Sequence, residues 1–217
     1  MIPAGLTLAD AGPFLARLTR LDRAALVRLR PAGSDALTLW GRLPWDVLVC
    51  RTVPVPSAVD TTLGAADLLT ALQSGSPTSP PARDAQWRSP LPPGAGTQVE
   101  VLPAEQVRQL AGAAAATLRA AGTGGLAGRP VGERMIRDAL LDHVPIVVLA
   151  DDRRVEVSQR LVQGLVRMGF VEPDGPGEVR VVVSGGWVGL AGRYGTVWRR
   201  ADATLALRPT GPHRPRP

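Results

Sequence analysis

A proline-rich stretch without helical or strand periodicity divides this chain into two halves. Residues 74–96 contain six prolines among serines and glycines. Because proline fixes φ and lacks an N–H donor, neither a helix nor a central strand can run through such a stretch. We therefore expect an N-terminal domain over 1–73, a linker or strap over 74–97, a C-terminal unit over 98–200 and a disordered tail over 201–217. Trp87 favours a strap that docks on the body over a free linker.

The N-terminal half predicts a helix, an antiparallel meander and a second helix. Asp10 and Pro13 mark a helix start, and the residues after them are apolar at helical spacing as far as Leu21. From Ala24 the period changes to two, which indicates strands. We place the strands at about 24–30, 37–42, 45–53 and 59–63, and the second helix at 65–72.

The C-terminal half predicts a three-helix unit that ends in a β-hairpin or small meander. A short strand at 99–101 precedes an alanine-rich helix from Pro103 to about Ala121, a glycine-rich connector at 122–128, and a helix at 131–143. The third helix, about 155–168, ends at Gly169. Leu161, Leu165 and Met168 of that helix are expected to be buried with Phe170. The expected fold class is α+β, in which the two sheets join or pack into one body.

The basic side chains are all arginine, which weakens any inference from charge. The chain has 25 arginines, no lysine and no asparagine, and its formal net charge is only +6. Such a composition is typical of a GC-rich genome.

Few residues are available for catalysis. The single cysteine, Cys50, lies in an apolar strand-like run, and of the two histidines His143 ends a helix and His213 lies in the tail. No nucleophile–base pair, zinc spacing or lysine-based chemistry can be assembled from this set. We expect no enzymatic activity, no cofactor and no metal.

The N-terminus lacks the basic and apolar regions of a signal peptide, and no apolar run approaches the length of about 20 residues that crosses a bilayer. We therefore expect a cytoplasmic protein without a membrane partner.

The segment from Ser158 to Val171 resembles the recognition helix and wing of a winged helix-turn-helix module. Arg160, Gln163 and Arg167 fall on one stripe of the predicted helix, and Arg180 and Arg193 lie in the hairpin region. The resemblance implies that the stripe contacts base edges and that the hairpin arginines contact phosphates. The alternative is an ordinary solvated helix face. The apolar connector 144–154 also departs from the pattern, because it is longer than a helix-turn-helix allows.

The whole chain resembles a family of actinobacterial proteins of unknown function. The resemblance rests on Phe14 to Asp22, on Trp40-Gly41-Arg42 through Val53, on Ser184-Gly185-Gly186-Trp187 and on Tyr194-Gly195-Thr196-Val197. It implies a host lineage and a shared fold.

Two functions remain open from the sequence, and both are non-enzymatic. The first is a nucleic-acid binder, with DNA as the expected partner of the winged-helix-like half. The alternative is a protein–protein interaction module anchored by a tryptophan such as Trp40, Trp45 or Trp87, since interfaces favour aromatic and arginine anchors. The sequence predicts no oligomeric state.

Overall fold

The first half of the chain forms a meander with a helix on either side of it in the sequence. The computed structural model describes residues 2–76, 78–124, 133–150 and 153–201. Thr7 and Asp10 form a capping box that starts the first helix. The elements of this half are α1 (Leu8–Leu21), β1 (Leu26–Pro31), β2 (Leu37–Leu43), β3 (Val47–Val53), β4 (Thr61–Gly64) and α2 (Ala65–Ser74).

The second half repeats this arrangement of helix, meander and edge strand, and it also contains an insertion. It contains β5 (Thr97–Pro103), α3 (Ala104–Gly124), α4 (Glu133–Asp142), β6 (Ile146–Ala150), β7 (Arg153–Val157), α5 (Gln159–Arg167), β8 (Glu178–Ser184), β9 (Trp187–Gly192) and β10 (Gly195–Arg200). In each half a helix precedes a three-stranded meander, and the first strand of the meander pairs with an edge strand. The helix, meander and edge strand are α1, β1–β3 and β4 in one half, and α5, β8–β10 and β5 in the other.

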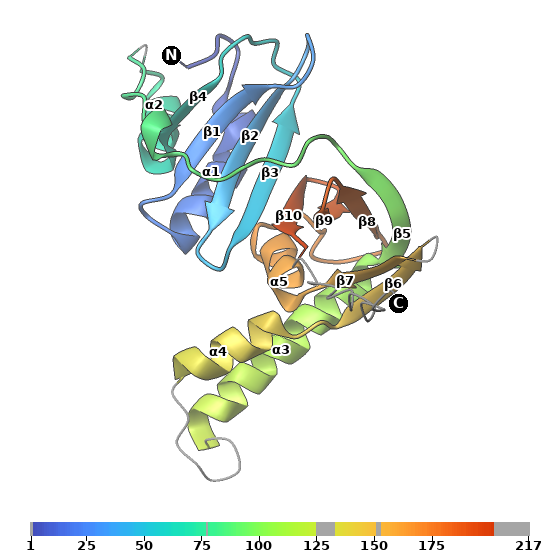
Figure 1. Ribbon diagram of the computed structural model, residues 1–217. Coiled ribbons are helices and arrows are strands. Elements are labelled where there is room, and N and C mark those ends of the chain that lie inside the picture. Colours follow the sequence, from blue (N-terminus) through green and yellow to red (C-terminus); the bar gives the residue numbers. More distant parts are fainter. Residues whose placement is uncertain (1, 77, 125–132, 151–152, 202–217) are drawn as a thin grey trace, which may run out of the picture.

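One antiparallel sheet of eight strands joins the halves, in the order β4-β1-β2-β3-β10-β9-β8-β5. The joint is the pairing of β3 with β10, in which Val197 lies opposite Val49. The predicted α+β class is therefore confirmed, with both meanders in a single sheet (Figure 1).

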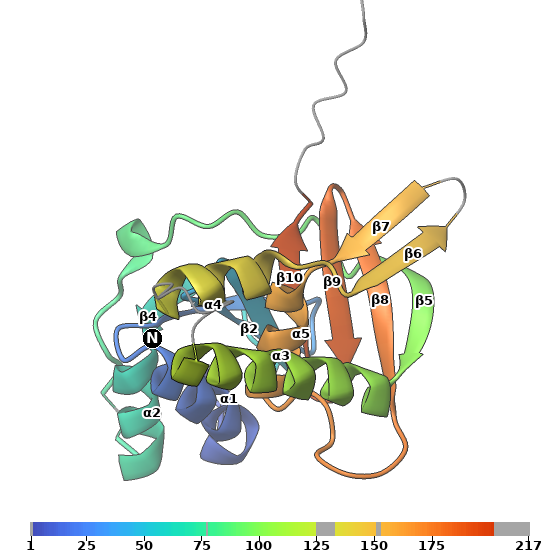
Figure 2. The ribbon, with the colours of Figure 1, turned by 90° about the horizontal axis from the view of Figure 1, so that it is seen from below.

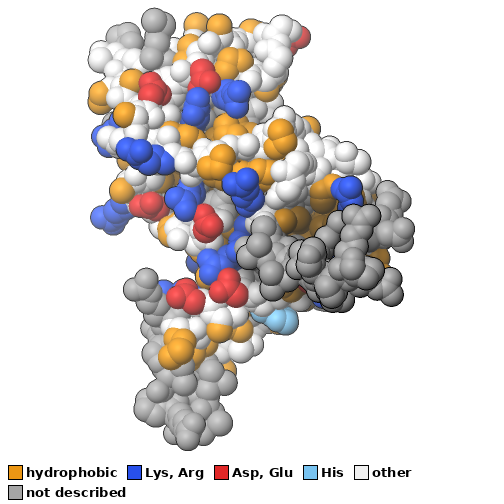
Figure 3. All heavy atoms as spheres, in the orientation of Figure 1, with side chains coloured by type: hydrophobic (Ala, Val, Ile, Leu, Met, Phe, Trp, Pro, Cys, Tyr) orange, Lys and Arg blue, Asp and Glu red, His pale blue; other side chains and the backbone are white. Residues whose placement is uncertain are grey.

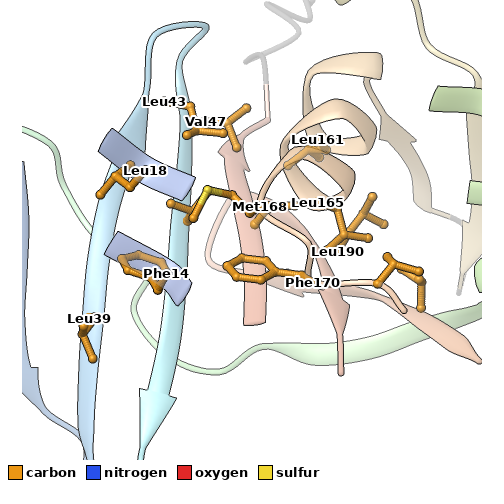
Figure 4. Close-up of a cluster of buried hydrophobic side chains, with 14 of the residues drawn as sticks. Phe14, Leu18, Leu39, Leu43, Val47, Leu161, Leu165, Met168, Phe170 and Leu190 are labelled. Atoms are coloured by element: carbon orange, nitrogen blue, oxygen red, sulfur yellow. The ribbon is translucent and has the colours of Figure 1, made fainter. Parts of the chain in front are cut away.

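The main core lies between this sheet and the helices α1 and α5. Phe14 of α1 and Phe170 after α5 stack with ring centroids 6.3 Å apart, so the two halves meet inside the core as well as in the sheet. Leu161, Leu165, Met168 and Phe170 are all at most 2 % exposed, which confirms their predicted burial (Figure 4). A Cβ on Gly164 would lie 3.2 Å from Val47, so glycine at this position allows α5 to approach the sheet closely.

The proline-rich segment docks along the opposite face of the sheet, as a strap (Figure 1). Its short 3-10 helix η1 (Asp84–Gln86) covers the outer edge of β4, because Arg83 N–H donates to the Thr62 carbonyl and Thr62 N–H donates to the Asp84 carboxylate. Farther along, Trp87 and Leu91 pack against a second apolar cluster on this face, which includes Trp198 and Cys50. The strap thus protects one edge of the sheet and fills its second apolar surface.

The insertion in the second half consists of the α3–α4 helical hairpin and the β6–β7 arm. Figure 1 shows the hairpin projecting from the body, and Figure 2 shows α3 and α4 side by side. In the part of α3 whose side chains are described, 104–120, the buried residues are Ala104, Val107 and Ala111 of its first part. The alanine-rich stretch beyond it is mostly exposed.

The sequence misplaced the start of α5. Residues 153–157 form strand β7, and the helix begins at Gln159. Val155 and Val157 are buried while Arg154 and Glu156 are exposed, a period of two that belongs to a strand.

The winged-helix resemblance is not confirmed, because β8, β9 and β10 belong to the large sheet. Most of the 122–128 connector and the tail from 202 lie outside the described residues.

Candidate functional site

A groove of about 890 Å³ separates the α3–α4 hairpin from the rest of the body, and we call it the α5 groove. In Figure 3 the surface is hollowed between the body and the projecting hairpin. Apolar and cationic side chains dominate the lining, which consists of Leu21, Pro44, Trp45, Ala114, Ala115, Leu118, Arg137, Asp138, Leu140, Leu141, Gln159, Arg160, Gln163 and Arg167. This volume is within the range of ordinary ligand-binding clefts.

The two glutamines of α5 bind the hairpin through hydrogen bonds to backbone carbonyls of α3. Gln159 Nε2 donates to the Leu110 carbonyl at 3.2 Å, and Gln163 Nε2 donates to the Ala111 carbonyl at 3.0 Å. Gln163 is only 8 % exposed, because α3 covers the helix face on which it lies. The prediction that Gln163 lies on an exposed stripe of the helix that contacts base edges is therefore wrong.

Arg160 is fully engaged in the fold. Its Nε donates to Asp142 Oδ1 at 2.7 Å and its Nη1 donates to the Trp45 carbonyl at 2.9 Å. Trp45 Nε1 in turn donates to the Arg160 carbonyl at 3.2 Å. The hydrogen bond from Arg160 lowers the pKa of Asp142, and the same bond raises the pKa of Arg160. This network ties α5 to the end of α4 and to the β2–β3 turn.

Arg167 is the exposed member of the predicted stripe. Its guanidinium lies 5.4 Å from the centroid of the Trp45 ring, which is cation–π geometry. Its Nε donates to Gln163 Oε1 at 3.3 Å. Arg167 and the half-buried Trp45 thus form a cationic and aromatic pair on the groove wall.

The remaining two predicted residues lie elsewhere. Arg180 is exposed on β8, next to Val179 and Val181 of the main core, so its side chain emerges on the opposite face of the sheet. Arg193 lies in the β9–β10 turn, where it forms a 2.6 Å ion pair with Glu172 and covers Tyr194. The five residues do not form one surface.

Sequence reasoning missed the hairpin side of the groove. Leu118 and Leu140 line it together with the exposed Ala115; Leu140 was expected on the inner face of its helix and the alanines were expected to pack closely against another element, but no groove was predicted there. The signal was present in the run of alanines at 111–116, since small side chains leave room beside a helix.

No catalytic arrangement is visible in the described part of the chain. Burial raises the pKa of the Cys50 thiol to about 12, which removes the thiolate that nucleophilic chemistry needs. Within the same ranges, no three histidine, cysteine or acidic side chains gather as metal ligands. No helix there is long and apolar enough to span a membrane.

Family comparisons divide the chain at the strap. Residues 91–204 match the domain of unknown function DUF8185, which is more than half of the chain. The chain belongs to the DUF8185 family. Its DUF8185 region contains the whole α5 helix and the α3–α4 hairpin, and residues 2–89 match a second domain of unknown function, DUF8010. No curated protein has a matching sequence.

The fold resembles that of bacterial sliding clamps, the beta subunits of DNA polymerase III. The clamp from Bartonella birtlesii matches with a TM-score of 0.57 at 13 % identity, over 92 % of this chain and 65 % of the clamp. The Pseudomonas aeruginosa subunit gives 0.56 at 12 % identity, over 90 % and 63 %. The Thermotoga maritima subunit gives 0.53 at 8 % identity, over 91 % and 64 %. This chain thus spans less than two thirds of the clamps' length, and at such identities the likeness is one of fold.

These findings overturn the nucleic-acid prediction. The C-terminal half shares a sheet with the N-terminal half in a sliding-clamp-like fold, so it contains no separate winged-helix module. Its supposed recognition helix α5 is covered by the sheet on one side and by α3 on the other. A helix covered in this way cannot enter a major groove.

Proposed function

We propose that this protein is a non-enzymatic protein-interaction module whose partner occupies the α5 groove. The observation that carries the proposal is the pairing of Arg167 with Trp45 on the wall of a groove lined mainly by apolar and cationic side chains. Tryptophan and arginine are the residues that most often dominate the binding energy of interfaces. The similar solved structures are named as subunits of DNA polymerase III, which supports a role within an assembly.

The α3 helix provides a matched pair of variants to test this proposal. Ala115 is exposed and lines the groove, whereas Ala113 is exposed and is not among the lining residues. Residues two positions apart lie on different sides of a helix. Ala115→Trp therefore fills the groove, and Ala113→Trp adds the same side chain outside it.

The measurement is quantitative affinity capture from the host, with the full chain and each variant as bait. We expect at least one protein to be retained by the wild type and by Ala113→Trp but lost with Ala115→Trp. Retention of every captured protein by Ala115→Trp would refute the groove as the interaction site. Circular dichroism spectra that match the wild type establish that both variants fold.

A further inference from the structure

Arg167 is held in a fixed orientation but has no acidic partner. Its Nε is bonded to Gln163, which is itself bonded to α3, and its guanidinium carbon lies 5.4 Å from the centroid of the Trp45 ring. Among the described residues, no carboxylate lies within ion-pair distance of Arg167. Because the contacts made by Nε and the ring leave the terminal nitrogens available, Arg167 can receive a carboxylate through its outer N–H groups.

Among the charged side chains of the groove, Arg167 is the one that we consider for receiving a carboxylate. Arg160 is only 16 % exposed and already bonded to Asp142. Three cationic side chains line the groove, and Asp138 is the one acidic side chain among the lining residues. Because Asp142 neutralises Arg160, the groove is left with Arg137 and Arg167 against Asp138, a net surplus of one positive charge that an acidic occupant complements.

The rest of the lining is mainly apolar and therefore favours an occupant with apolar side chains. The hairpin contributes Leu118, Leu140 and Leu141 beside small alanines, and the body contributes Leu21, Pro44 and the ring of Trp45. Aliphatic or aromatic side chains that enter this space lose their contact with water, which stabilises the complex.

We infer that the occupant of the α5 groove is an acidic, apolar peptide segment of a partner protein. Such a segment places one carboxylate on Arg167 and a large aliphatic or aromatic side chain between Trp45 and Leu118. This inference rests on the proposed function and specifies the chemistry of the partner at the same groove.

The test uses a displayed library of short random peptides selected on the full-length wild type. Peptides that compete for the groove are recognised because they bind Ala113→Trp but not Ala115→Trp. We expect these peptides to be enriched in Asp or Glu next to a large apolar residue. We also expect Arg167→Glu to weaken their binding by about tenfold or more, and added salt to weaken it further.

Arg180→Glu is the matched control, because it makes the same charge change at an exposed arginine on the opposite face of the sheet. It is expected to leave affinity unchanged. Groove-binding peptides without acidic enrichment, or with affinity indifferent to Arg167→Glu, would overturn the inference while leaving the groove as an interaction site. Selection of no peptide that distinguishes Ala115→Trp from Ala113→Trp would count against the proposed function itself.

Discussion

Leu165 lies at the contact between α5 and the sheet and is completely buried. Leu165→Ala removes apolar contacts and leaves a cavity, so the free energy of unfolding is expected to fall by roughly 2 to 5 kcal/mol. Leu149→Ala is the control, because Leu149 is 82 % exposed and its replacement should change the same quantity by less than about 0.5 kcal/mol. Urea denaturation of both variants measures the two effects. Equal losses would contradict the assigned burial.

Cys50 provides a chemical test of the second apolar cluster. Its thiol is buried beneath Trp198 and the strap, and burial raises its pKa to about 12. We expect iodoacetamide to leave the native protein unmodified near pH 8, because the thiolate is the reactive form. Mass spectrometry should find one adduct only after denaturation. Rapid labelling of the folded protein would show that the strap does not cover this face.

The polar residues of α5 mark the limit of sequence reasoning at this scale. Leu161 and Leu165 follow the helical period, so their burial was predicted from spacing alone. Gln163 lies on the side that the pattern assigns to solvent, yet α3 covers it and accepts its hydrogen bond. Spacing reports which residues share a face, but it does not report whether a distant element packs on that face.

The α3–α4 hairpin is joined to the body by the buried first part of α3 and by a set of polar contacts near its base. Arg160 binds Asp142 at the end of α4, and the two buried glutamines bind the carbonyls of α3. Because the outer part of α3 is exposed, these contacts determine how the hairpin stands relative to the groove.

The Arg160–Asp142 ion pair should make the attachment of α4 to α5 sensitive to acid. The folded-state pKa of Asp142 is lowered, chiefly by the hydrogen bond from Arg160. The stability that the pair contributes is therefore present above the unfolded-state pKa, near 3.9, and is lost as the pH falls through the folded-state pKa. Since Asp142 is 58 % exposed, solvent screening limits the contribution to about 1 kcal/mol or less.

Asp142→Asn tests this dependence. The variant should unfold more easily than the wild type near pH 7, and the difference in free energy should be smaller near pH 3. Denaturant titrations at the two pH values measure it. A difference that grows on acidification would contradict the sign of the pKa shift.

Element boundaries were predictable where one local pattern held without competition. The meander strands β1 to β3 were placed within a few residues by their alternation. Strand β7 was absorbed into the following helix, because Val157 stands four residues before Leu161 and Val155 seven before Val162, spacings that a helix also brings to one face. A segment of five residues is too short for periodicity alone to decide between a strand and a helix.

At the scale of the whole molecule, the two halves share a sheet and a core. The β3–β10 pairing and the Phe14–Phe170 stack cross between the halves, and the strap spans them. None of these contacts is encoded in a local pattern. The sequence therefore predicted the first meander, left the second as a hairpin or small meander, and allowed their union without specifying which strands would meet.

This shared construction predicts that the halves unfold together. Unfolding followed by tryptophan fluorescence and by far-ultraviolet circular dichroism should give coincident transitions, because neither half keeps its core without the other. Two transitions separated in urea would show that the halves are stable independently.

The β3–β10 pairing also dictates the order in which this protein can mature on the ribosome. Strand β3 is among the first to be synthesised, and its partner β10 lies at the far end of the sheet-forming sequence. Throughout most of translation the nascent N-terminal meander therefore carries an open, hydrogen-bonding edge beside a half-built core. Such edges recruit other chains. We therefore expect this edge to need protection from other chains until β10 closes the centre of the sheet.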